Sequence, residues 1–259
     1  MSRADPSPSA SFGVLVLTLL MAVGGMIYLG ERSGAGASEV PKAGDRDGGL
    51  AAGPGVPRVV ETVLGRSQCA NAGYLCTGLA QRDEPRILRW SDDTRVIRIG
   101  LPVPEGVPPN RARALQAAAA AGILTWQDKP FRIEIDRTPQ GSDVDFGVRW
   151  SAQLEGAQLG RADTRWFRKT DGRTGMQVSD FVLVYRNPFD TRLPLDPRKV
   201  ELASAHEMGH ALGLPHSDSE RDVMYPTNTA HALSVRDYAT MSALYSVENG
   251  ALVPPLSPP

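Results

Sequence analysis

The sequence predicts an α+β fold, in which a mixed twisted sheet accompanies a long helix and a second helix close to the C-terminal end. Helix signals stand at residues 197–212 and 233–245, and the sheet, within residues 87–187, is implied by the family resemblance that residues 206–226 carry. Hydrophobic residues make up 41% of the 259-residue chain, which is enough for one globular core with appendages.

The first of these helices has clear start and stop signals. Asp196 is a good N-cap, and Pro197 falls at the first helical position, where proline is favoured. Gly213 can adopt the left-handed conformation that ends many helices, and Pro215 opposes a continuation. The chain should therefore turn back after residue 212.

The second helix is predicted from its cap and its periodicity. Ser234 and Asp237 have the spacing of a capping box. Apolar residues recur at helical intervals through Val235, Tyr238, Met241 and Leu244.

Three of the four histidines lie in the stretch HEMGHALGLPH, from His206 to His216. His206 and His210 are four residues apart, so a helix places them on one face, where both can reach one metal ion. His216 becomes available as a third ligand once the chain has turned. Three imidazoles leave one position open, as in catalytic zinc sites, and Glu207 can reach a water molecule there.

Chance is the alternative explanation for two histidines of the HExxH type, because many helices have such a polar face. The longer pattern H-E-x-x-H-x-x-G-x-x-H fixes five positions and is the signature of metzincins, which also have a methionine turn. The complete pattern favours a zinc site.

On these residues the chain resembles the metzincin metallopeptidases, with their zincin-like fold, and the matrixin-like group among them. Ser217 follows the third histidine, as in many matrixins. The stretch VMYP, residues 223–226, is similar to the methionine turn, which would place Met224 beneath the zinc ligands. Residues 233–245 are similar to the closing helix of the matrixin catalytic domain.

The resemblance also implies the elements upstream and a catalytic domain at residues 87–250. Residues 112–129 are similar to a long first helix, capped by Asn110 or a neighbour. The expected strands lie within residues 87–104, 131–136, 143–150 and 180–187.

The activity that the resemblance implies is a zinc-dependent endopeptidase. It would hydrolyse peptide bonds of extracytoplasmic proteins through a zinc-bound water activated by Glu207. A catalytically silent, zinc-stabilised module that binds a protein partner is the alternative. The intact Glu207 argues against this alternative, because a binding module needs no base there.

The substrate would lie extended along an edge strand of the sheet. Residues 143–150 are the candidate edge, and an ordinary core strand is the alternative. The pocket beside the zinc is expected to involve Leu202, Tyr225, Pro226 and Thr227.

The sequence also bears on two other metal ions, a second zinc and calcium. Matrixins of the animal type bind a second, structural zinc through several histidines, but only His231 lies outside the motif here, so no second zinc is expected. Calcium is possible, although Asp163, Asp171 and Asp180 match no register of calcium ligands.

The N-terminal part differs in composition from the rest. After a flank of residues 1–11, residues 12–30 contain nineteen residues without a charge, which suits a transmembrane anchor or a signal segment. Residues 31–57 are predicted to be a flexible linker, and the proline-rich residues 251–259 a disordered tail. The protein is therefore expected outside the cytoplasm, anchored to the membrane or secreted after signal cleavage.

Both cysteines lie in an N-terminal segment, residues 58–86. Cys69 and Cys76 are seven residues apart, which favours a small disulfide-closed loop and an oxidising compartment. The alternative is that one thiolate binds the zinc and keeps the enzyme latent. A net charge of −1 gives no reason to expect nucleic acid as a partner.

Overall fold

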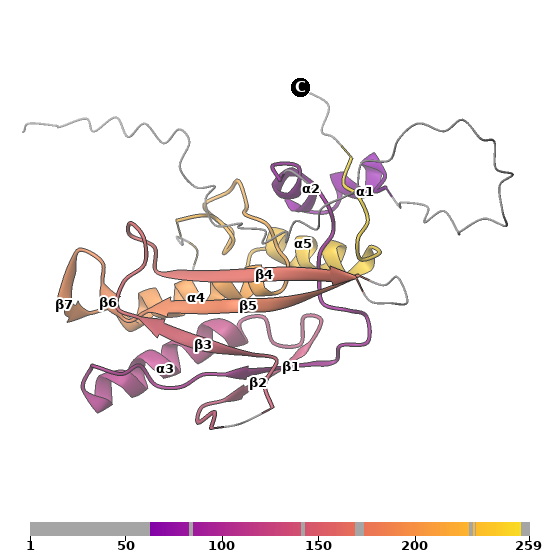
Figure 1. The fold of residues 1–259 in the computed structure, drawn as a ribbon. Helices are drawn as coiled ribbons and strands as arrows, with labels where there is room; N and C mark the ends of the chain where they lie inside the picture. The colour runs from indigo at the N-terminus through magenta and orange to yellow at the C-terminus, as the bar shows by residue number, and fades with distance from the viewer. Residues whose placement is uncertain are drawn as a thin grey trace, which may run out of the picture. The chain divides into compact units, whose positions relative to one another are not determined.

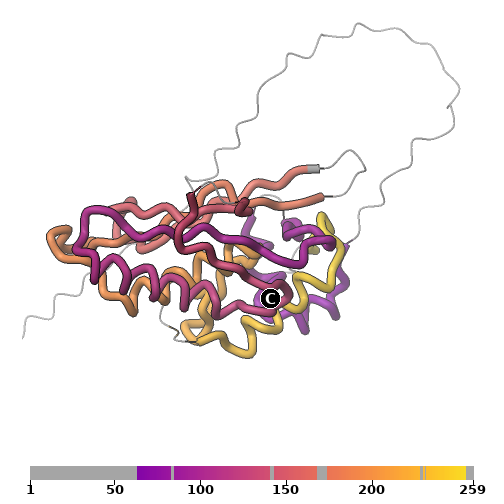
Figure 2. Tube along the Cα trace, turned by 90° about the horizontal axis from the view of Figure 1, so that it is seen from below, coloured from indigo at the N-terminus to yellow at the C-terminus, as the bar shows by residue number. Residues whose placement is uncertain are grey.

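A five-stranded mixed sheet with helices on one of its faces forms the central part of the molecule (Figures 1 and 2). The computed structural model describes residues 63–82, 85–140, 143–168, 174–227, 230 and 232–254. The predicted α+β class is confirmed.

The elements follow one another in this order: α1 (Arg66–Ala70), α2 (Leu75–Leu79), β1 (Val96–Gly100), α3 (Pro109–Leu124), β2 (Arg132–Asp136), β3 (Phe146–Ser151), β4 (Gly160–Arg168), β5 (Thr174–Val184), β6 (Arg186–Asn187), β7 (Asp190–Pro194), α4 (Pro197–Ala211) and α5 (Val235–Ser246).

The order of strands in the large sheet is β2-β1-β3-β5-β4. The first four strands are parallel, whereas β4 runs antiparallel to β5. The edges are therefore β2 and β4. The prediction that residues 143–150 form a substrate-binding edge is wrong, because β3 pairs on both sides, with β1 and with β5.

The two predicted C-terminal helices lie where their sequence signals placed them. Asp196 caps α4 by accepting a hydrogen bond from the backbone N–H of Arg198 at 2.8 Å. Ser234 and Asp237 form the capping box of α5. In contrast, α3 begins before Asn110, with Pro108 in the cap position.

Several elements were not predicted. Helices α1 and α2, strand β7 and the edge strand β4 all lie in segments for which no element was expected, and residues 186–187 at the end of the expected fourth strand form the separate short strand β6. Within residues 87–104 only Val96–Gly100 is a strand, and β5 begins at Thr174, before the expected residue 180. Strand β4 carries mostly half-buried and exposed residues, so it lacks the apolar alternation that identifies a strand.

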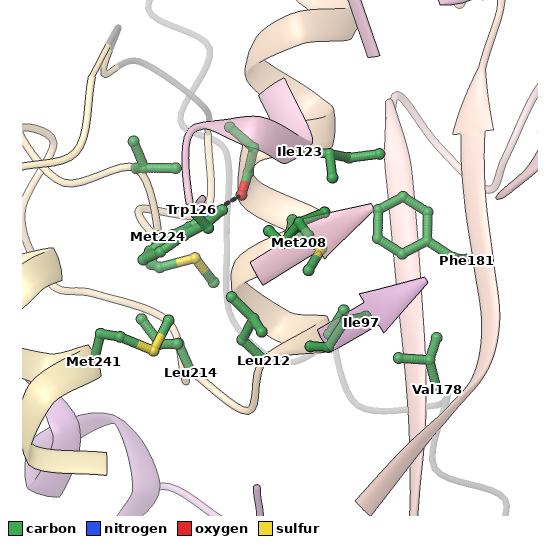
Figure 3. Close-up of a cluster of buried hydrophobic side chains, with 14 of the residues drawn as sticks. Ile97, Ile123, Trp126, Val178, Phe181, Met208, Leu212, Leu214, Met224 and Met241 are labelled. Carbon is green, nitrogen blue, oxygen red and sulfur yellow. Dashed lines mark hydrogen bonds between the residues drawn. The ribbon is translucent and has the colours of Figure 1, made fainter. Parts of the chain in front are cut away.

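Buried side chains such as Phe181 and Met208 pack between the sheet and α4, and the core continues beyond Met208 to Met224 and Trp126 (Figure 3). The indole N–H of this buried residue donates to the backbone oxygen of Ala205 in α4, at 2.8 Å. Helices α3 and α4 approach closely at Gly122, where a Cβ would lie 2.1 Å from the backbone oxygen of Glu201. Small residues at this crossing fix the position of α4.

Within the described residues, no helix is both long and apolar enough to cross a membrane. The predicted membrane or signal segment, residues 12–30, and the predicted linker, residues 31–57, lie outside the described residues, as do residues 255–259 of the predicted tail. The first residues of that tail are ordered, because Ala251 and Val253 are buried and Leu252 forms a bridge with Val63.

Candidate metal centre

The three histidines of the motif converge on one point. One nitrogen from each of His206, His210 and His216 lies within 4.8 Å of the other two. The Nε2 atom of His210 is 3.1 Å from Nε2 of His206 and 3.1 Å from Nε2 of His216. Two nitrogens that bind one zinc ion tetrahedrally at 2.0–2.1 Å are about 3.3 Å apart, so the observed spacing suits zinc.

The other ring nitrogens of two histidines determine which atoms face this point. The Nδ1 atom of His206 is 2.8 Å from the backbone oxygen of Val223, and Nδ1 of His210 is 2.9 Å from that of Leu214. A carbonyl oxygen can only accept, so each Nδ1 carries the proton and donates. Each Nε2 atom then presents a lone pair to the other. A cation between them removes this repulsion, which is the arrangement of histidine ligands in zinc sites.

Two glycines shape the chain around the ligands. Gly213, at φ +101°, ends the turn after α4, and a Cβ there would lie 2.4 Å from the backbone oxygen of Leu88. Gly209 lies on α4 between the first two ligands, and a Cβ there would lie 2.1 Å from Sδ of the fully buried Met224. Met224 thus packs against α4 at Gly209, between His206 and His210.

Burial keeps the imidazoles neutral. It lowers the pKa of His206 to about 4, and the hydrogen bond to Val223 opposes this shift only in part. Burial also lowers the pKa values of His210 and His216, and the charge of Arg82 lowers both further. Neutral imidazoles are the form that binds a metal ion.

Glu207 is buried on the side of α4 that faces β4. Burial raises the pKa of its carboxyl group to about 8, and the charge of Asp163 raises it further, while a backbone hydrogen bond from Ala162 opposes the shift. A Cβ at Gly160 would lie 2.5 Å from Cγ of Glu207 and 2.9 Å from its Oε1. The start of the edge strand therefore determines where this carboxylate lies. This contact could not be predicted from the sequence, because β4 was not predicted.

The remaining predicted residues are distributed around the centre. Leu202 is half-buried, one turn before His206 on α4, and Tyr225 is half-buried next to the methionine. Pro226 and Thr227 are exposed. Their role in a substrate pocket stays a prediction.

Cys69 and Cys76 are joined by a disulfide. Neither sulfur is thus a free thiolate, which the alternative of a cysteine-capped zinc requires.

The aspartates considered for calcium are engaged by arginines where they are described. Asp180 accepts from Arg149 at 2.6 Å and from Arg161 at 3.1 Å, and Asp163 lies 3.0 Å from Arg161. Asp171 lies outside the described residues.

Comparison with known proteins bears on the same region. The family model for matrixin, Peptidase_M10, matches residues 142–246, a range that contains all three histidines. The predicted resemblance to matrixins is confirmed.

Two individual proteins are similar over smaller or weaker alignments. Macrophage metalloelastase from Rattus norvegicus is 42% identical over 66 residues, which are 22% of this chain and 14% of that relative. The chain thus matches only a small part of that relative's length. A crystal structure of Wss1 from Saccharomyces cerevisiae aligns at 13% identity with a TM-score of 0.30, covering 62% of this chain and 92% of that chain.

Proposed function

We propose that the protein is an endopeptidase that uses one zinc ion and acts on proteins outside the cytoplasm. The observation that carries the proposal is the convergence of three imidazole nitrogens beside a buried carboxyl group, Glu207. The matrixin match supports the zinc peptidase chemistry. The disulfide between Cys69 and Cys76 supports an oxidising compartment, and the uncharged residues 12–30 support an anchor or export signal.

Glu207 would act as the base of the reaction. Bound zinc supplies Lewis acidity toward a water molecule and toward the carbonyl group of the substrate. The carboxylate accepts the proton of the attacking water and then donates it to the leaving amine. The positive charge of Arg161 favours the ionised form of Glu207 and opposes part of the effect of burial on its pKa.

The substrate-binding role that was expected for residues 143–150 is assigned instead to strand β4. It is an edge of the sheet, and Gly160 at its start contacts Glu207. An extended peptide can add to such an edge by main-chain hydrogen bonds. A substrate paired with β4 would thereby pass close to the metal centre.

The test is the turnover of a quenched peptide library by the full-length protein. Glu207→Ala should retain zinc and lose turnover, whereas His210→Ala should lose zinc. Chelator treatment should abolish turnover, and added zinc should restore it. Zinc bound at one ion per chain without any turnover would contradict the proposal and favour a protein-binding module. Near-normal turnover of Glu207→Ala would exclude its role as the base.

A further inference from the structure

The segment of residues 63–82 contains α1, α2 and the disulfide, and we call it the disulfide segment. It precedes the matrixin match, which begins at residue 142. It nevertheless packs against the metal centre. At Gly78 in α2, a Cβ would lie 2.7 Å from the backbone oxygen of His216 and 2.7 Å from Cβ of Pro215. The disulfide segment thus supports the loop that carries the third histidine.

Tyr74 connects the disulfide segment to α5. Its side chain is fully buried, and its hydroxyl donates to Oδ1 of Asp237 at 2.7 Å. Its backbone N–H donates to Oγ1 of Thr240 at 3.0 Å. The preceding Gly73 has φ +60°, and a Cβ there would lie 2.3 Å from the same Oγ1. Two hydrogen bonds and a close backbone approach therefore fix Tyr74 on α5.

Asp237 continues this connection toward the metal centre. Its carboxylate is fully buried, and Oδ2 accepts from the backbone N–H of Val223 at 3.0 Å and from that of Ser234 at 2.8 Å. The backbone oxygen of Val223 in turn accepts from Nδ1 of His206 at 2.8 Å. A single residue, Val223, therefore lies between the carboxylate of Asp237 and the ring of His206, because its N–H binds the first and its C=O binds the second.

We propose that Tyr74 is a positioning residue for the metal centre, because its hydroxyl fixes Asp237, Asp237 fixes the backbone of Val223, and Val223 orients His206. The proposal rests on the proposed zinc function. It makes the disulfide segment a permanent part of the catalytic domain and not a removable inhibitor.

The physical reason is the number of donors that the buried carboxylate requires. Two backbone N–H groups serve Oδ2, and the hydroxyl of Tyr74 serves Oδ1. Without this hydroxyl, Oδ1 loses a buried donor, and the carboxylate turns or admits water to replace it. The backbone of Val223 moves with the carboxylate. The orientation of the His206 ring depends on that backbone, and outer partners of this kind control metal affinity.

The test compares the full-length protein with Tyr74→Phe, which removes the hydroxyl and retains the ring. Zinc affinity is measured by competition with a chelator. We expect Tyr74→Phe to weaken zinc binding about 10-fold, at the lower end of the effect of outer-shell substitutions. In the metal-free protein, NMR should show faster exchange of the Nδ1 proton of His206.

The matched control is Tyr245→Phe. Tyr245 is half-buried, and its hydroxyl donates to the backbone oxygen of Leu212 at 2.7 Å. This variant loses a phenol hydrogen bond of similar length, so it should lose stability and retain zinc affinity within about twofold. An equal loss of zinc affinity in both variants would show a merely structural effect and overturn the proposal.

A double variant and a proton-exchange measurement test the positioning role of Tyr74 independently of the single variants. In an Asp237→Ala background, which leaves no side-chain partner for the hydroxyl, Tyr74→Phe should have no additional effect on zinc affinity. In the unmodified protein, the Tyr74 hydroxyl and the Nδ1 proton of His206 should be protected from exchange to a similar degree, each relative to the rate of the same group in an unfolded peptide, and an unprotected hydroxyl would overturn the proposal without any variant. If zinc binds but Tyr74→Phe leaves its affinity unchanged, the positioning role alone fails. If the unmodified protein binds no zinc, the proposed function fails with it.

Discussion

The sulfur of Met224 lies 2.1 Å from the place that a Cβ of Gly209 would occupy. A side chain at Gly209 would also come within 3.2 Å of the Trp126 ring. Because Met224 is fully buried, its sulfur has little space into which to move. Glycine in the middle of α4 is therefore a packing requirement, despite its cost to the helix of about 1 kcal/mol against alanine.

We predict that Gly209→Ala lowers the free energy of unfolding by about 1–3 kcal/mol through overpacking. In a Met224→Val background, which lacks the sulfur, the same change should be neutral or stabilising because alanine favours the helix. Chemical denaturation of the four proteins forms a double-mutant cycle. Equal losses in both backgrounds would show that the methionine is not the obstacle.

A second prediction concerns Gly160 and Glu207. A Cβ at Gly160 would overlap Cγ and Oε1 of Glu207, so Gly160→Ala should displace the carboxylate. A shift of about 1 Å in a catalytic group can cost about 100-fold in rate, so we expect kcat to fall by this order with zinc still bound. Peptide turnover and metal analysis measure the two quantities.

Gly147→Ala in β3 is the matched control, because the nearest atom to its Cβ would be the backbone oxygen of Gly100 at 4.0 Å. It should leave kcat unchanged. Loss of turnover in both variants would point to a general effect on the sheet.

The metal centre could be predicted from the sequence because its parts are local. His206, His210 and His216 lie within eleven residues, and Asp196 and Pro197 mark the start of the helix that positions the first two. The register of an α-helix then determines which side chains meet.

Contacts across the chain could not be predicted in this way. Tyr74 and Asp237 are 163 residues apart, and no local pattern in either segment indicates that they meet. The position of β3 inside the sheet depends on its pairing with β1 and β5, which its own residues do not reveal. Strand β4 lies at an edge and has few buried residues, so its sequence resembles that of a loop.

A third prediction concerns the stability of the metal-free protein above pH 4.5. Burial raises the pKa of Glu207 from 4.5 to about 8, so the folded state retains a proton that the unfolded state has lost. The contribution of Glu207 to the free energy of unfolding is fully present below pH 4.5 and is lost as the pH rises toward 8. With chelator present, Glu207→Gln should thus become progressively more stable than the unmodified protein between pH 5 and pH 8, by about 1.4 kcal/mol or less per pH unit. Parallel stability curves from denaturation at each pH would exclude the shift.

The histidines should have the opposite effect, which the Glu207→Gln background isolates. Burial lowers the pKa of His206 from 6.5 to about 4, so between these values the unfolded state binds a proton that the folded state does not. The contribution of His206 to the free energy of unfolding is therefore fully present above pH 6.5 and is lost as the pH falls toward 4. The free energy of unfolding of metal-free Glu207→Gln should therefore fall over this range. Adding His206→Gln should reduce the pH slope by up to one proton, whereas an unchanged slope would show that His206 titrates normally in the folded protein.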